Sequence, residues 1–334
     1  MGVKNLIKFI ERYAPSSVRS TRITDYRNKT IGIDANLLLY KLILAIRQNG
    51  YDITNLTNNY DDDDDANTDI LTRTPPEEIM VTHIHSLILK LIAFKQHNII
   101  PVFVFDSGAP VIKADTLEDR KKARDAIIKK YKNSKTDKGK RIYYYMKADI
   151  TSKEFDECRE LIKLFDYSII DAKEEADAQL VQLYKAGLVD SIASEDMDIL
   201  LFGGGVLLRN FTIAHNKEIR EISLSDLLKS AKITQNELIQ IGILLGTDYC
   251  DIPNISPMKA YDLIKKSGDL ENTTIGNKCN DARKYFQSPP VTKIKQLNDL
   301  TVTNVDHLVE FLRRFYFKNK YIDRVLENLK MTHC

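Results

Sequence analysis

The sequence predicts an α/β protein with a doubly wound, mainly parallel sheet. Short apolar runs, several of which end in an acidic residue, alternate with longer segments whose apolar residues recur at helical spacing. Right-handed crossovers between parallel strands place helices on both faces of such a sheet. With 334 residues, 43% of them hydrophobic and 29% charged, the chain can bury a large core, and we expect one domain over residues 1–334.

Two predicted buried strands in the first third of the chain each end in an aspartate, Asp34 and Asp106. The elements expected there are, in order, a helix over 4–14, a strand over 30–35, helices over 37–48 and 77–97, and a strand over 99–106. Residues 51–76 are rich in Asn, Asp and Thr and have nothing to bury. We therefore expect an acidic, mobile surface loop inserted there.

A strongly basic segment follows these elements. From Lys113 to Arg141 there are twelve Lys or Arg residues against five Asp or Glu, with little apolar periodicity. We expect this segment to stand away from the core. It suits a phosphate backbone, and the nearby Tyr131 and the tyrosines at 143–145 suit exposed bases, although an ordinary solvated charged helix has the same composition.

Two acidic clusters lie on either side of a short predicted helix near the middle of the chain. Glu174, Glu175 and Asp177 come after a strand expected over 167–171, and the helix that follows ends at Gly187. A strand over 189–193 then precedes Glu195, Asp196 and Asp198. Either cluster alone could be a solvated helix cap. Ligands of open α/β sheets, however, bind at the carboxyl ends of the strands.

The acids of several strands are expected to meet at one edge of the sheet, because the strands run parallel. A sheet buried on both faces does not need them for stability, so we interpret them as a site. Carboxylates with few histidines favour Mg²⁺ or Mn²⁺ over zinc. Two such ions held by acids are the usual device for in-line cleavage of phosphodiesters.

Other classes of protein are disfavoured. The four cysteines, at 158, 250, 279 and 334, are far apart and form no CxxC pair, which argues against zinc and against a disulfide scaffold and indicates a reducing, intracellular environment. No apolar run reaches membrane-spanning length and the N-terminus has no secretory pattern, so no membrane association is expected.

Six segments together resemble the flap endonuclease branch of the 5′-nuclease superfamily, in order and from Met1 to about Lys330. They are MGVKNLIKFI at the start, Ile33-Asp34-Ala35, Val104-Phe105-Asp106, Glu175-Ala176-Asp177, Glu195-Asp196-Met197-Asp198 and Leu245-Gly246-Thr247-Asp248-Tyr249-Cys250. The resemblance implies a PIN-like core with a helical arch over 113–150, a helix–two-turn–helix DNA-binding region over 234–268 and C-terminal helices over 300–330.

The resemblance also implies which residues form the site. Two Mg²⁺ ions, replaceable by Mn²⁺, would be held by seven carboxylates: Asp34, Asp106, Glu175 and Asp177 nearest one ion, and Asp196, Asp198 and Asp248 nearer the other. Asp34 and Asp198 would take part in catalysis. Helical geometry pairs Glu174, rather than Glu175, with Asp177, so Glu174 stays open as an alternative ligand.

DNA contacts follow from the same resemblance. Lys113 and Arg120 match the cations that reach the scissile phosphate from the arch, and Arg124 lies in the same basic segment. Tyr40 matches an aromatic that stacks on a base, although core packing would explain it equally well. Arg47 matches a duplex contact, and Lys259, in the helix–two-turn–helix region, is also expected to bind DNA.

The chain departs from the family pattern in three places. The separation of Asp34 and Asp106 is longer than usual because of the 51–76 insertion, beside the region that normally holds a 3′ flap. Asn254 and Ser256 stand where glycines are expected. No sliding-clamp peptide is recognisable before Cys334.

We thus expect a monomeric, Mg²⁺-dependent, structure-specific DNA endonuclease that cuts 5′ flaps in replication and repair, with 5′-exonuclease activity, in the nucleus or another site of DNA replication. The alternatives are a mainly 5′–3′ exonuclease or junction-resolving relative, a non-catalytic DNA-binding scaffold, and a metal-dependent phosphatase of small substrates.

Overall fold

The computed structural model describes residues 2–47, 53–54, 80–146, 150–211, 218–250, 255–270, 279–297 and 304–330. The chain divides into two compact units. The first consists of Met1–Leu38, His97–Ala123 and Ser168–Asp299, and the second of Leu39–Gln96, Arg124–Tyr167 and Leu300–Cys334. Nearly all of the acidic insertion expected over 51–76 lies outside the described residues, and a single domain over 1–334 stays a prediction. No helix in these described ranges is long and apolar enough to cross a membrane.

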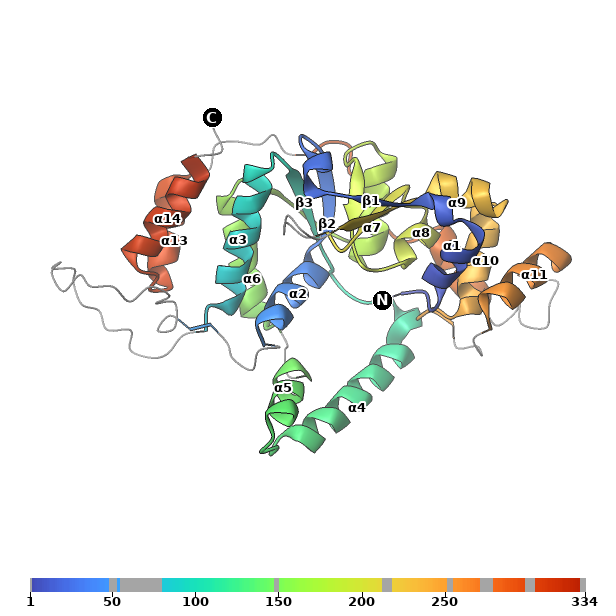
Figure 1. The fold of residues 1–334 in the computed structure, drawn as a ribbon, viewed down its shortest axis with the longest axis horizontal. Helices are drawn as coiled ribbons and strands as arrows, with labels where there is room; N and C mark the ends of the chain where they lie inside the picture. The colour runs from blue at the N-terminus through green and yellow to red at the C-terminus, as the bar shows by residue number, and fades with distance from the viewer. Residues whose placement is uncertain are drawn as a thin grey trace. The chain divides into compact units, whose positions relative to one another are not determined.

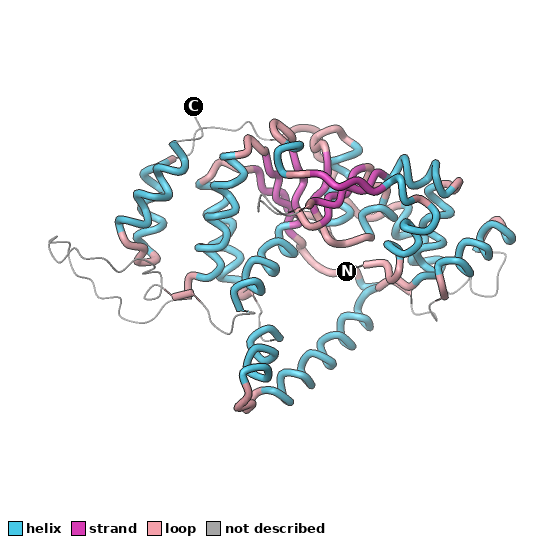
Figure 2. The backbone as a smooth tube through the Cα atoms, in the orientation of Figure 1, coloured by secondary structure: helices cyan, strands magenta, loops and turns pink. Residues whose placement is uncertain are grey.

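The first unit contains a seven-stranded sheet in its described part (Figure 2). Its strands are β1 (Val18–Thr21), β2 (Thr30–Asp34), β3 (Ile100–Phe105), β4 (Ser168–Asp171), β5 (Ser191–Ala193), β6 (Val206–Arg209) and β7 (Ile219–Ser223), in the spatial order β1-β7-β6-β5-β2-β3-β4. The five strands from β6 to β4 are parallel, whereas β7 is antiparallel to both its neighbours. The predicted mainly parallel sheet is therefore confirmed.

The strand order reverses at β2. From β2 the chain moves outward to β3 and β4 on one side, and then returns to β5 and β6 on the other. Asp34 lies opposite Val104, and Ile33 lies opposite both Phe103 and Ala193. The carboxyl ends of β2, β3 and β5 are thus neighbours at the topological switch point, where open sheets of this kind bind ligands.

Helices of the first unit cover this sheet and extend beyond it (Figure 1). They are α1 (Leu6–Tyr13), α7 (Ala176–Lys185), α8 (Asp198–Phe202), α9 (Leu224–Ala231), α10 (Gln235–Leu245), α11 (Pro257–Ser267) and α12 (Asn280–Gln287), with short 3-10 turns η1 (Pro15–Ser17), η2 (Ile23–Tyr26) and η3 (Val111–Lys113). Helix α7 packs on β2, β3 and β5. A Cβ at Gly32 would meet Leu180 Cδ2 at 2.8 Å, so the glycine in β2 permits this close packing.

The second unit is helical. Its α3 (Thr82–Gln96) packs against α6 (Ser152–Leu164) and α14 (Asn319–Lys330), and α13 (Val305–Arg314) packs on α6. His83, buried in α3, contacts Glu157 of α6 through Nε2 and Oε2 at 2.7 Å. Helix α5 (Asp137–Met146) also belongs to this unit, whereas α2 (Ala35–Arg47) and α4 (Ala114–Tyr131) each contain residues of both units.

The expected helices and strands match the observed ones closely. The spacing of the cysteines, however, had argued against disulfide bonds, and one is present. Cys250 and Cys279 form a disulfide with their Cα atoms 5.6 Å apart. Their separation of 29 residues gave no sign of pairing. The pair forms because α12, which the sequence did not predict, packs against α10 and brings its N-cap Cys279 beside Cys250. Cys158 is a buried free cysteine.

Candidate functional site

Four carboxylates are placed at one sheet edge by the strands that precede them. Asp34 is the last residue of β2 and Asp106 directly follows β3, while Asp196 and Asp198 follow β5. Backbone N–H groups orient three of them: Leu37 N donates to Asp34 Oδ1 at 2.9 Å, Ala176 N to Asp106 Oδ1 at 2.7 Å, and Asp198 N to Asp196 Oδ1 at 2.9 Å. The bond to Asp106 also satisfies a free N–H in the first turn of α7.

The centre of this group is buried. Asp34, Asp177 and Asp196 are each 8% exposed, and Asp198 is fully buried. Among the described residues, none donates a hydrogen bond to either carboxylate oxygen of Asp198 or to Oδ1 of Asp177. A buried carboxylate without donors is costly unless a positive charge compensates it. These oxygens therefore fit a cation.

The pKa shifts indicate that Asp34, Asp177, Asp196 and Asp198 interact electrostatically. Burial, followed by the negative charges of Asp196, Asp34 and Asp198, raises the pKa of Asp177 well above its ordinary value. Burial and then the charge of Asp196 raise the pKa of Asp198 in the same way. Carboxylates that repel one another inside a protein usually share a proton or a metal ion.

The acids do not form a finished metal cage. In the described part of the chain, no group of three or more His, Cys, Asp or Glu side chains is arranged so that it could hold a metal ion as it stands. Like charges raise the pKa values of such carboxyl groups, so the binding of a cation to them is coupled to their deprotonation. The chemistry of the donors, which are carboxylate oxygens without histidine or cysteine, fits a hard divalent cation such as Mg²⁺.

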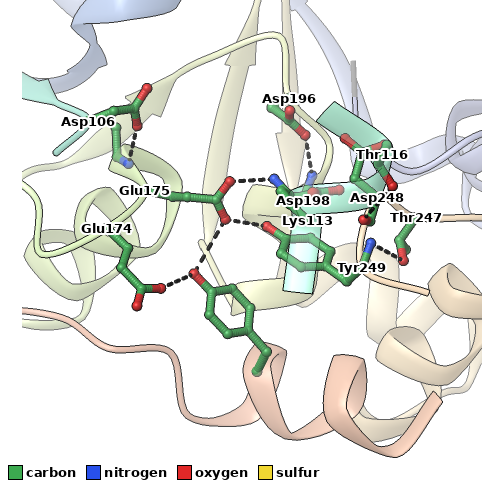
Figure 3. A network of polar contacts seen from close by, with 12 residues as sticks. Asp106, Lys113, Thr116, Glu174, Glu175, Asp196, Asp198, Thr247, Asp248 and Tyr249 are labelled. Atoms are coloured by element: carbon green, nitrogen blue, oxygen red, sulfur yellow. Dashed lines mark hydrogen bonds and ion pairs between the residues drawn. The ribbon is translucent and has the colours of Figure 1, made fainter. Parts of the chain in front are cut away.

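Glu175 is held from two sides (Figure 3). The ammonium of Lys113, which is itself buried, forms an ion pair with Oε1, and Tyr249 Oη donates to Oε2 at 2.6 Å. Lys113 Nζ also lies 4.2 Å from the centre of the Tyr249 ring. Burial opposes the charge of Lys113, but the nearby carboxylates of Glu175 and Asp198 outweigh burial and raise the pKa of the ammonium. Lys113 is therefore a fixed positive charge beside the acids.

Arg120, which lies on α4, forms an ion pair with Asp248. Its Nη2 donates to Asp248 Oδ1 at 2.6 Å, and Thr116 Oγ1 donates to the backbone carbonyl of Asp248 at 3.1 Å. Two residues of α4 thus hold the segment that carries Asp248, and Figure 3 shows one of them, Thr116. Arg120 remains more than half exposed, with 55% of its side chain accessible, so it can still reach a ligand.

All seven predicted carboxylates, together with Lys113 and Arg120, lie in the first unit. Glu174, the alternative to Glu175, accepts a hydrogen bond from Tyr285 at 2.9 Å, and Glu175 is among the charges that act on Asp198. Tyr40 and Arg124 belong to the second unit, and Arg47 is the last residue of α2. Lys259 is exposed in the first turn of α11.

Three residues of the site were missed from the sequence. Tyr249 lies beside Asp248 in the motif, and that adjacency is a signal that could have found it. Tyr285 lies on α12 and no local pattern marks it. Gly2 has a positive φ of 73°, and a Cβ there would lie 1.9 Å from Asp196 Oδ1, so only glycine fits beside the acids.

Comparisons with known proteins agree with this arrangement. Residues 1–127 match the XPG N-terminal domain and residues 166–248 match the XPG I-region. Together these matches include every carboxylate of the predicted set.

Two curated relatives are flap endonuclease 1 proteins. The protein from Homo sapiens is 32% identical over 277 residues, which cover 81% of this chain and 68% of the human protein. The protein from Babesia bovis is 32% identical over 342 residues, which cover 99% of this chain but 48% of that protein. The chain therefore spans about half the length of the Babesia protein.

A solved structure shares the fold. The catalytic core of Rad2 in complex with DNA substrate superposes with a TM-score of 0.70 and 21% sequence identity, covering 98% of this chain and 100% of that one. At this level of identity the likeness concerns the fold.

Proposed function

Because the chain belongs to the flap endonuclease family, we propose that it hydrolyses phosphodiester bonds of DNA near the junction between a duplex and a 5′ single-stranded flap. A 5′-exonuclease activity of the same centre accompanies this reaction in our proposal. The protein would act as a monomer in DNA replication and repair, inside the cell and, in a nucleated cell, in the nucleus.

The observation that supports this proposal is that buried carboxylate oxygens of Asp177 and Asp198 receive no hydrogen bond from the part of the chain that the structure describes. Two Mg²⁺ ions, replaceable by Mn²⁺, would satisfy them. We assign Asp34, Asp106, Glu175 and Asp177 to one ion and Asp196, Asp198 and Asp248 to the other. When bound, such ions activate a water and stabilise the leaving oxygen of a phosphodiester.

The side chains around the acids have their own tasks. Lys113 and Arg120 now neutralise Glu175 and Asp248. Both side chains would bind the non-bridging oxygens of the scissile phosphate once the acids hold cations. Asp34 and Asp198, on neighbouring segments at the switch point, would hold the reacting groups in line. Tyr249 keeps the Glu175 carboxylate directed inward.

The remaining basic and aromatic residues would bind DNA away from the cut. We assign phosphate contacts to Arg47, Arg124 and Lys259, and base stacking to Tyr40. The arch is proposed over 113–150, where α4 and α5 supply most of the basic residues. A sliding clamp is a conceivable partner, although no clamp-binding peptide is recognisable in the sequence.

A panel of DNA substrates tests the proposal. The purified chain is incubated with labelled 5′-flap, nicked, blunt and four-way DNA, with and without Mg²⁺. We expect cleavage of the 5′ flap to be fastest, to stop without Mg²⁺ and to stop in Asp198→Asn. Faster cutting of four-way or blunt DNA favours the junction-resolving or exonuclease alternative. Binding without cleavage identifies a scaffold, and turnover of nucleotides identifies a phosphatase.

A further inference from the structure

Helix α12 directs one tyrosine hydroxyl at two adjacent carboxylates of the site. Tyr285 Oη lies 2.9 Å from Glu174 Oε2 and 3.4 Å from Glu175 Oε2. Tyr249 Oη donates to the same Glu175 oxygen at 2.6 Å. The Glu175 carboxylate thus has Lys113 on one oxygen and two tyrosine hydroxyls on the other.

Both hydroxyls are fixed by the packing of their rings. The centres of the Tyr249 and Tyr285 rings are 5.1 Å apart. Phe202 lies edge-on to both rings, at 6.4 Å from Tyr249 and 6.0 Å from Tyr285. Phe286, the residue after Tyr285, lies 4.8 Å from the Tyr249 ring and 4.9 Å from the Phe202 ring. Such a cluster leaves the rings little freedom to turn.

Helix α12 is itself anchored beside this cluster. Its N-cap Cys279 is bonded to Cys250, the residue that follows Tyr249, and its Ala282 and Phe286 are buried. The position of the Tyr285 hydroxyl therefore depends on a helix that is covalently joined to the segment carrying Asp248 and Tyr249.

We propose that Tyr285 is a positioning residue that holds the Glu175 carboxylate in the orientation needed to bind a divalent cation. Glu174 Oε2, at 2.9 Å, is the nearer acceptor and keeps the hydroxyl at the site, and Glu175 Oε2, at 3.4 Å, is the second acceptor. A tyrosine needed only for packing would not have to direct its hydroxyl toward two carboxylates. The inference rests on the proposed function, since it assigns a ligand role to Glu175.

The variant Tyr285→Phe tests the inference, because it keeps the ring and removes the hydroxyl. Binding of Mg²⁺ to the full chain is measured by calorimetry without DNA, and the Mg²⁺ concentration for half-maximal flap cleavage is measured separately. We expect the affinity for Mg²⁺ to fall, and the Mg²⁺ concentration for half-maximal cleavage to rise, by about three- to tenfold, as for the loss of one hydrogen bond. The maximal rate should be largely restored at saturating Mg²⁺. Tyr26→Phe is the matched control, because Tyr26 Oη donates to Glu221 at 2.8 Å elsewhere in the same unit.

The two readouts separate this inference from the proposed function. Weaker Mg²⁺ binding in Tyr285→Phe but not in Tyr26→Phe supports the inference even if no DNA is cut. Equal binding in Tyr285→Phe and the unmodified chain overturns it, as does a chain that binds no Mg²⁺ at all. If Tyr285→Phe is misfolded by circular dichroism, Tyr285→Leu, which also lacks the hydroxyl, is measured with the same criteria.

Discussion

Arg120 Nη2 donates to Asp248 Oδ1 at 2.6 Å, so a cation proposed to bind the scissile phosphate is paired with a proposed metal ligand. The pair links α4 to the segment that follows α10. Arg120 and Lys113 each pair with one acid of the group, Asp248 and Glu175.

Replacing Arg120 with Ala should slow catalysis and leave the stability of the fold nearly unchanged. Flap cleavage should slow by at least about tenfold, because a positive charge at the phosphate is lost. The melting temperature should change little, because exposed ion pairs contribute little to stability. Lys29→Ala, which removes the exposed Lys29–Asp190 pair away from the acids, is the control and should leave cleavage unchanged. Equal rates for Arg120→Ala and the unmodified chain would contradict the role of Arg120.

Replacing Asp198 with Asn should abolish cleavage and leave DNA binding largely intact. The same change should make the metal-free protein more stable, because it removes a buried acidic group to which no described residue donates a hydrogen bond. Cleavage assays, a DNA-binding titration and thermal unfolding in a chelator check these outcomes. Retained cleavage would remove Asp198 from the site.

Stabilisation by Mg²⁺ should increase with pH. The carboxyls of Asp177 and Asp198 have pKa values raised by burial and by neighbouring acids, so the folded, metal-free chain binds more protons than the unfolded chain above the ordinary carboxyl pKa. Its free energy of unfolding therefore falls as pH rises from the ordinary toward the raised pKa values.

Cations reverse this penalty by favouring the charged carboxylates. The rise in melting temperature on adding Mg²⁺ should thus be larger at about pH 8 than at about pH 5. Thermal unfolding with Mg²⁺ and with a chelator, at several pH values, measures this rise in melting temperature. In Asp198→Asn the dependence should be weaker, and a rise independent of pH would argue against these acids as ligands.

Gly2→Ala should weaken the site from the N-terminal side. The added Cβ would lie 1.9 Å from Asp196 Oδ1 and 2.6 Å from Asp198 Oδ1, at a φ of 73° that disfavours alanine. We expect weaker Mg²⁺ binding by calorimetry and slower cleavage. Gly108→Ala is the control, since its Cβ would meet no atom within 4 Å. Equal effects of the two substitutions would show that Gly2 has no special role.

Reduction of the Cys250–Cys279 disulfide should lower stability. The bond closes a loop over a separation of 29 residues, and loop entropy sets an upper limit of about 3–4 kcal/mol for its contribution. Denaturant unfolding with and without reductant measures the loss. Cys279→Ala should be less stable to begin with and insensitive to reductant. If reductant does not change the free energy of unfolding of the unmodified chain, the disulfide does not form in solution.

The mainly parallel sheet and its acidic edge were predictable because strands and helices have different apolar periods and Asp34 and Asp106 end buried runs. The antiparallel strands β1 and β7 were not predicted. In β1 (Val18–Thr21) the two central residues are polar and exposed, so it has no clear apolar pattern. Register and hand follow from general rules once the strands are known.

The site was predictable only in part, because some of its residues come together through contacts between distant segments of the chain. Carboxylates are marked by their positions after strands, whereas Tyr285 and Cys279 act through a helix far along the chain. Their contacts depend on how α12 packs, which no local pattern encodes. Likewise, Gly2 is needed because of what lies beside it in space.

The most direct test of the account is a crystal structure of the chain soaked in Mn²⁺, with the ions located by anomalous scattering. We expect two peaks at the carboxyl ends of β2, β3 and β5, one near Asp34, Asp106, Glu175 and Asp177 and one near Asp196, Asp198 and Asp248. A map with no manganese among these side chains, while ions occupy other surfaces, would contradict the assignment of this edge as the nuclease centre.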